Sequence, residues 1–203
     1  MRYLSPALIL LATLAFQAPA AHATPITFVA NLIGANEFPP SGSAGTGFAT
    51  VVIDPAPAVH TMTVDVTFSG LGSGTTASHI HCCLASPFLT GVNVGVATTT
   101  PTFPMFPLGV TSGTYSHLFD LLDAGTYNPA FVTAQGGLLA AEMALINGIE
   151  NGLTYLNIHT VNFGGGEIRG FLVAAPEPAS LVLLGSALLG FGLMRRRKPA
   201  ARP

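Results

Sequence analysis

The chain has 203 residues, of which 49% are apolar and only 8% are charged, a length that suits one domain with accessory segments at its ends. Between residues 24 and 175, eight acidic residues stand against a single basic residue, Arg169, so this segment carries a net charge of −7 with its histidines neutral. That charge excludes nucleic acid and anionic lipid as electrostatically bound partners, and it favours cations.

The first 23 residues have the pattern of a secretion signal. Arg2 precedes an apolar stretch that is too short for a transmembrane anchor, and Ala21 and Ala23 form an A-x-A cleavage site. We therefore expect the Sec translocon to export the chain and the mature protein to begin at Thr24.

Residues 24 to 121 are expected to form short β-strands, because apolar and polar side chains alternate between segments rich in Gly and Pro. The clearest strand covers residues 59–68, where Met62, Val64 and Val66 alternate with polar side chains. Three prolines between residues 98 and 110 predict an extended loop without a regular ladder. The expected strands are 24–33, 48–53, 59–68, 76–81, 92–97 and 114–121.

Residues 128–149 depart from this pattern and predict a small helical insertion. Pro129 suits the first turn of a short helix, and apolar residues from Leu138 onward recur at helical spacing until Gly148. The sequence therefore predicts an all-β fold, a Greek-key-like β-sandwich or barrel with this insertion. A signal peptide and a C-terminal hydrophobic helix are expected to flank it.

The last two predicted strands form a hairpin whose loop spans residues 162–166. In the expected register His159 faces Arg169, while Leu156 and Ile158 lie on the core side. This register places no polar residue in the core.

Glu167 and Arg169 share one face of the second of these strands. We interpret both as structural, in an ion pair or in hydrogen bonds to neighbouring loops, rather than as catalytic residues. Arg169 is expected to bond Glu37 or another acid and so to tie loops together.

Four segments, in the order of a known family, carry a resemblance. They are Asn31–Pro40 (NLIGANEFPP), Phe68–Leu71 (FSGL), His79–His81 (HIH), and NIHT from Asn157 followed by GGEIRG from Gly165. Together they resemble the CHRD domain, named after chordin, over residues 26–173. The resemblance implies an extracytoplasmic all-β domain, with expected bounds 24–175, and it implies little about chemistry.

The end of the chain has three parts. They are Pro176-Glu177-Pro178, an apolar run over residues 179–194, and a basic cluster of Arg195, Arg196, Arg197 and Lys198. Over residues 176–203 this arrangement resembles the PEP-CTERM sorting signal of Gram-negative bacteria. The resemblance implies recognition by an exosortase, cleavage near Pro-Glu-Pro, and delivery to the cell envelope or an extracellular polysaccharide matrix. The apolar run would enter the inner membrane transiently; the alternative is a permanent single-span anchor.

A candidate metal site comes from three histidines. His79 and His81 stand two residues apart on a strand, so both imidazoles lie on one face, and His159 lies on the side away from the core in the expected register. Neutral imidazole suits zinc and copper. The residues that could complete the site are His117, Glu167 and Asp123, with Asn157 to orient a ring.

The same histidines have a plainer interpretation, since polar residues opposite a core face occur on any half-exposed strand. The HIH pattern also resembles the paired histidines of copper–zinc superoxide dismutases. The other ligands of those enzymes have no counterpart that can be placed in this sequence, so the activity is not carried over. We find no serine–histidine–acid set and no nucleotide fingerprint in the sequence, and we assign no catalytic residue.

Cys82 and Cys83 are the only two cysteines, and they are adjacent. Export favours an oxidised state, and we interpret the pair first as a vicinal disulfide. The alternatives are intermolecular pairing, thiolates that extend the histidine pair into a soft metal site, and two free buried thiols.

The interpretation that these features favour is an exported cell-envelope or extracellular-matrix protein with a binding or structural domain and no enzymatic activity. Its expected partners are matrix polysaccharide or envelope proteins. The competing hypothesis is a copper- or zinc-binding redox protein or metalloenzyme of superoxide-dismutase-like architecture.

Overall fold

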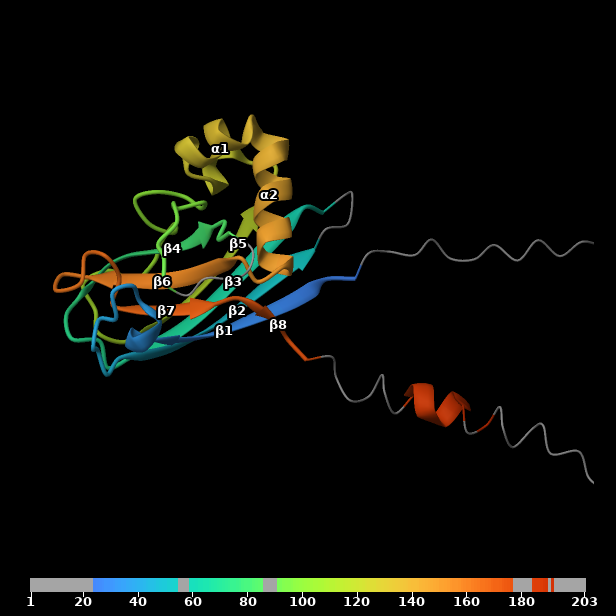
Figure 1. The fold of residues 1–203 in the computed structure, drawn as a ribbon, viewed down its shortest axis with the longest axis horizontal. Coiled ribbons are helices and arrows are strands. Elements are labelled where there is room, and N and C mark those ends of the chain that lie inside the picture. The colour runs from blue at the N-terminus through green and yellow to red at the C-terminus, as the bar shows by residue number, and fades with distance from the viewer. Residues whose placement is uncertain (1–23, 55–58, 86–90, 177–183, 190, 192–203) are drawn as a thin grey trace, which may run out of the picture.

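A computed structural model describes residues 24–54, 59–85, 91–176, 184–189 and 191. Within them, the strands join in one antiparallel sheet that curls into a half-barrel, with the order β4-β6-β7-β1-β2-β3-β5 and β8 paired with β1 (Figure 1). The strands are β1 Ile26–Ile33, β2 Thr46–Asp54, β3 Thr61–Ser69, β4 Thr75–Cys82, β5 Gly113–Asp120, β6 Thr154–Thr160, β7 Ile168–Phe171 and β8 Val173–Ala174. The helices are the 3-10 turns η1 Gly34–Asn36 and η2 Ala124–Thr126, and the α-helices α1 Pro129–Gln135 and α2 Leu138–Glu150.

The interior of the curl is filled by one apolar side of each strand. In β3, Met62, Val64, Val66 and Phe68 are buried, while the threonines between them are partly or fully exposed. This alternation buries apolar surface on one face only, as the sequence predicted. The all-β fold with a small helical insertion is therefore confirmed.

The helical insertion covers one side of the sheet (Figure 1). Asn128 caps α1 by accepting a hydrogen bond from the Ala130 amide, and Pro129 occupies the first turn, as expected for a residue that lacks an amide donor. In α2, Ala141, Leu145 and Ile149 are fully buried in the main core. The insertion is thus part of the core.

The prediction of a strand at residues 92–97 is wrong, because within this segment only Val96 forms an isolated bridge, to His81. It runs along the free edge of β4, where the Ala97 amide donates to the Ile80 carbonyl at 3.0 Å. The Ile80 amide donates to the Thr98 hydroxyl, so a side chain replaces the ladder bond that a regular strand would make. An irregular segment, and not a strand, therefore covers β4.

The expected register of the β6–β7 hairpin is wrong by two residues. Asn157, and not His159, faces Arg169, while His159 faces Ala77 of β4. The difference arises because the loop takes up more residues than expected, and the Glu167 amide donates back to Ile158. A shift of two preserves every face, so the predicted core side of β6 is correct.

Arg169 and Glu167 have separate partners. Arg169 forms a buried ion pair with Glu37, at 2.7 Å between Nη2 and Oε2, and both side chains are almost completely shielded from solvent. Glu167 instead accepts hydrogen bonds from three groups, which are the Ser43 hydroxyl, the Gly72 amide and the Thr160 hydroxyl. Both residues therefore hold loops against the sheet.

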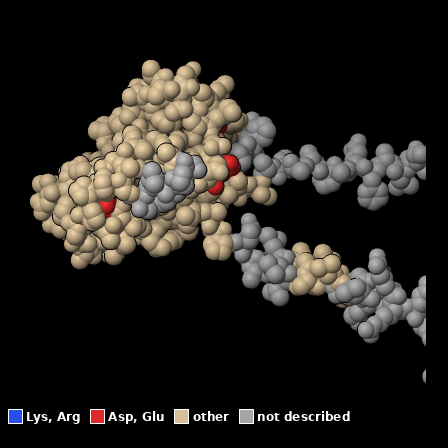
Figure 2. Space-filling model, viewed as in Figure 1, with Lys and Arg blue, Asp and Glu red and all other residues tan. Residues whose placement is uncertain are grey.

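Charged side chains are sparse on the described surface. The face in Figure 2 shows a few acidic side chains and no lysine or arginine among the residues that the structure describes. Arg169, the one arginine of the domain, is buried and pairs with Glu37.

The predicted signal-cleavage residues Ala21 and Ala23 lie outside the described residues. So do Glu177, Pro178, Arg195, Arg196 and Arg197 of the sorting segment; of that segment the structure describes residues 184–189, which are helical, and residue 191. Among the described residues, no single helix has the length and hydropathy of a membrane span; α1 and α2 pass that test only as a pair, which is bent by 94°.

Removing one partner of the buried ion pair should destabilise the domain strongly. In a Glu37→Gln variant Arg169 keeps its charge in a buried site without its counterion, so the free energy of unfolding should fall by about 3–5 kcal/mol. Urea denaturation measures this loss. The exposed Glu150 offers a matched control, since Glu150→Gln should change stability by no more than ~0.5 kcal/mol. Equal stability of the two variants would contradict the role given to the ion pair.

Candidate metal centre

Three histidines meet on the side of the sheet that faces away from the main core. His79 and His81 come from β4, and His159 comes from the neighbouring strand β6. One nitrogen of each ring lies within 4.8 Å of the corresponding nitrogens of the other two. Three imidazole nitrogens at this spacing could bind one zinc or copper ion after small side-chain movements.

Each ring is oriented by a hydrogen bond between its other nitrogen and a backbone carbonyl. Because a carbonyl oxygen only accepts, the bonded nitrogen must carry the proton, and the remaining nitrogen must carry a lone pair. This arrangement of an outer carbonyl and an inner lone pair is typical of metal-binding histidines. The bonds are His79 Nε2 to Pro101 O at 2.7 Å, His81 Nδ1 to Val94 O at 2.7 Å, and His159 Nδ1 to Gly164 O at 2.9 Å.

The lone-pair nitrogens have no partner of their own in the structure. His79 Nδ1, His81 Nε2 and His159 Nε2 are all buried and accept no hydrogen bond. An unsatisfied buried polar atom costs about 1–3 kcal/mol, so three at one point are a large cost for a domain of this size. A bound cation would satisfy all three.

Burial keeps these rings neutral. Loss of water lowers the pKa of His79 and of His81 to about 4, and the pKa of His159 is lowered for the same reason. The positive charge of Arg169 lowers the pKa of His81 and His159 further. At neutral pH the rings therefore present lone pairs, which is the state that binds a metal.

An aromatic and a charged side chain extend the cluster along the sheet. The Tyr155 ring stacks on His81 with centroids 4.6 Å apart, and the Arg169 guanidinium lies 3.9 Å from the centre of the Tyr155 ring. Asn157 is directly opposite His79 in the β4–β6 pairing and is fully buried. The polar face of these strands is thus a covered layer, and the interpretation of a half-exposed strand does not describe it.

The residues suggested to complete the site lie elsewhere. His117 stacks in β5 against Tyr115 and Phe119, Glu167 holds loops, and Asp123 caps η2 through the Gly125 amide. Among the described residues, none of the three belongs to the group of converging ligand atoms.

Sequence reasoning missed the backbone carbonyls that orient the rings. Those of Val94 and Pro101 belong to an irregular segment and that of Gly164 to a turn, so no side-chain pattern could have indicated them. The Tyr155–Arg169 stack was missed as well, and an alternation argument could have suggested it, because both residues project from the same face.

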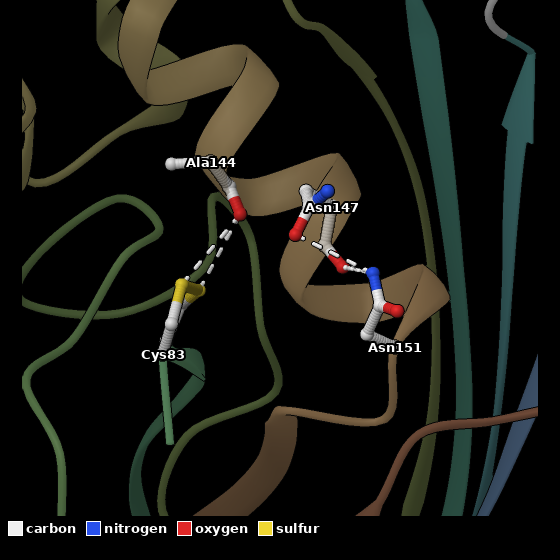
Figure 3. Close-up of a disulfide and its surroundings, with 5 residues drawn as sticks. Cys83, Ala144, Asn147 and Asn151 are labelled. Carbon is white, nitrogen blue, oxygen red and sulfur yellow. Dashed lines mark hydrogen bonds between the residues drawn. A yellow bond between two sulfur atoms is a disulfide. The ribbon is translucent and has the colours of Figure 1, made fainter. Parts of the chain in front are cut away.

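Cys82 and Cys83 are joined in a disulfide on the other side of β4 (Figure 3). Both sulfur atoms lie against α2, at 3.7 and 3.6 Å from the Ala144 carbonyl oxygen. A side chain at Gly148 would collide with them, since its Cβ would lie 2.6 Å from the Cys82 sulfur. The disulfide therefore belongs to the contact between β4 and α2, and the sulfurs are not part of the histidine cluster.

A shallow hollow of about 480 Å³ lies beside the centre. Phe38, Pro39, Asn93 and Phe163 form part of its wall, together with Gly164, whose carbonyl orients His159. The lining of this hollow is uncharged except for Glu37.

An all-β domain followed by an export-sorting segment defines an exported, envelope-directed protein. Comparison with known families identifies the domain and the sorting motif. The CHRD domain matches residues 28–172, and the PEP-CTERM protein-sorting motif matches residues 174–198. The chain belongs to the CHRD domain family, and its sorting motif implies processing by an exosortase during export. No curated protein and no solved structure matches it.

Metal-free protein should lose stability as the pH falls from 6.5 toward 4. In the unfolded chain His79 and His81 bind protons near pH 6.5, but in the folded chain only near pH 4. Their protonation therefore lowers the free energy of unfolding progressively as the pH falls through this interval. A shift of this size corresponds to about 3 kcal/mol per histidine. Urea denaturation at pH 7 and pH 4.5 measures the loss.

A His79→Gln/His81→Gln variant provides the comparison, because glutamine does not titrate. Its stability should fall less over the same interval. Burial raises the pKa of Glu37, which acts in the opposite direction, but this contribution is common to both proteins. Equal losses in the two proteins would show that the histidines do not have the expected pKa.

Proposed function

We propose that the mature protein is a metal-binding component of the envelope or extracellular matrix of a Gram-negative bacterium. In this proposal, residues 1–23 are removed on export, residues 24–175 form the CHRD domain, and residues 176–203 direct sorting. The domain binds one copper or zinc ion through His79, His81 and His159. The observation that carries the proposal is that three histidines whose ligand nitrogens converge each keep one buried nitrogen without a partner.

A metal at this point would act on the loops of the domain. The ligand rings hold carbonyls from two stretches of chain, at residues 94 and 101 of the irregular segment and at residue 164 of the turn after β6. A ligand that binds only the folded state stabilises it by mass action, so the ion would order these stretches. The role is then that of a metal-stabilised binding module, with matrix polysaccharide or envelope proteins as its partners.

The metal proposal predicts one equivalent of copper or zinc in protein purified from the envelope fraction without an affinity tag. Elemental analysis measures it. His79→Gln and His159→Gln should each lower the content by at least about tenfold, because a second-best site with two imidazoles binds far more weakly. His117→Gln is the matched control and should keep the full equivalent, since His117 lies outside the cluster.

Two results would contradict the metal proposal. One is protein without metal that also takes up neither copper nor zinc on dialysis. The other is metal that persists equally in the His79→Gln, His159→Gln and His117→Gln variants.

The sorting proposal predicts that Pro176, Glu177 and Pro178 are needed for removal of the tail. In cells that contain an exosortase, intact-mass analysis of the envelope fraction should find the parent chain without its basic tail. Replacing the three residues by alanine should leave the tail attached. Arg202→Ala, beyond the matched motif, is the control and should not alter processing. Removal of the tail from the alanine variant would contradict the proposal.

A further inference from the structure

The donor set of the histidine centre is electrically neutral. It consists of three imidazoles, and in the part of the chain that the structure describes no carboxylate or thiolate joins the group of converging ligand atoms. Two buried acids have partners outside the centre: Glu37 pairs with Arg169 through Oε2 and keeps an unpartnered Oε1, and Glu167 accepts three hydrogen bonds from loops. An ion that binds here would keep its full charge.

The surroundings of the donor set do not compensate that charge. Arg169 stacks on Tyr155, which stacks on His81, so a fixed positive charge lies close to the donor set. The negative charge of Glu37 cancels the positive charge of Arg169, so the pair supplies no net negative charge to a bound ion. The Asn157 side chain, which shares the row of His79, is also neutral, and its amide oxygen is buried without a partner.

Burial makes the charge of the ion decisive. His79 and His81 are only 6% and 8% exposed, and the three lone-pair nitrogens are shielded from solvent. The cost of moving an ion out of water rises with the square of its charge, so a divalent ion costs roughly four times as much as a monovalent ion of similar size. Anionic ligands usually offset that cost for Zn²⁺ in closed structural sites, through cysteine thiolates.

Coordination number points in the same direction. Where Zn²⁺ binds three imidazoles, a water completes its tetrahedron, whereas the unpartnered nitrogens here are shielded from solvent. Cu²⁺ prefers a tetragonal arrangement. Here three nitrogens converge, each fixed by a carbonyl bond behind its ring. Three neutral nitrogens suit a small monovalent ion with a low coordination number, and among biological metals that ion is Cu⁺.

We propose that the centre is a copper(I) site, and that it binds Cu⁺ in preference to Zn²⁺ and Cu²⁺. This inference rests on the proposed metal-binding function and adds the identity and oxidation state of the ion. The occupant follows from the neutral, buried, three-nitrogen donor set and from the arginine behind it.

The test is a pair of competition titrations on the exported chain after its metal has been removed with a chelator. Cu⁺ is titrated against bicinchoninate under ascorbate, and Zn²⁺ is titrated against a chromophoric zinc chelator. One Cu⁺ should bind per chain, on the order of a hundredfold more tightly than Zn²⁺. His159→Gln should abolish tight Cu⁺ binding, and His117→Gln should leave it unchanged.

A charge-changing variant tests the reason for the preference. His159→Asp replaces a neutral ligand by an anionic one at the most exposed of the three positions. It should weaken Cu⁺ binding while favouring Zn²⁺, and so lower the ratio of the two affinities by at least about tenfold, because an anion attracts a divalent ion more strongly. Near-ultraviolet circular dichroism confirms that each variant is folded.

The outcomes are distinct. Zn²⁺ bound as tightly as Cu⁺ would overturn the copper(I) inference and leave the metal-binding function standing. So would a Cu²⁺ signal in electron paramagnetic resonance that persists under ascorbate, or an unchanged affinity ratio in folded His159→Asp. Failure of the parent chain to bind any of the three ions would overturn the inference and the metal-binding function together.

Discussion

The pairing of β4 with β6 and of β6 with β7 is the constraint on which the candidate centre depends. It places His79, Asn157 and Arg169 in one row across three strands, on the face opposite the main core. A slip of one residue in either pairing would turn polar side chains of this row toward the core and would also bring Ile158 or Ile168 out of it. The packing of the apolar face therefore fixes the geometry of the polar face, and the two faces cannot change independently.

The polar face is a buried layer, and its composition follows from what covers it. The loop after β1 brings Glu37, and the irregular segment before β5 brings Asn93, so the two lie over the sheet and meet Arg169. A charge in such a place is stable only with a counterion and hydrogen bonds, which Glu37, Asn93 and the Val92 carbonyl supply. The histidines share this covered layer, and each keeps one buried nitrogen without a partner. What sets them apart is that ligand nitrogens of all three rings converge, so one bound cation could contact all three rings.

Much of this architecture could be predicted from the spacing of apolar and polar residues. The remainder depends on hydrogen bonds of loops and backbone groups, which that spacing does not reveal. The alternation in β3, the Pro129 start of α1 and the shared face of the histidines are properties of spacing, and they were predicted correctly. The hairpin register failed by two residues because loop length is set by hydrogen bonds within the turn, such as that from the Gly166 amide to the Phe163 carbonyl. The alternation in residues 92–97 predicts a strand, but this segment is irregular. The Thr98 hydroxyl accepts the Ile80 hydrogen bond that a strand carbonyl would accept, and this tertiary contact leaves no trace in the local sequence pattern.

Three of the four sequence segments that carry the family resemblance meet at this layer, while Phe68 and Leu71 of the second lie in the main core. The first brings Glu37 to Arg169 of the last, and the HIH segment supplies two of the three rings. Gly166 lets the last turn approach closely, because a Cβ at that position would collide with the Glu37 carboxylate. A ring in the centre thus connects to a loop through its carbonyl bond, and Arg169 of β7 contacts two covering segments through Glu37 and Asn93. Under the metal-binding proposal, an ion that fixes the rings would also order the segments whose carbonyls they hold, at residues 94, 101 and 164.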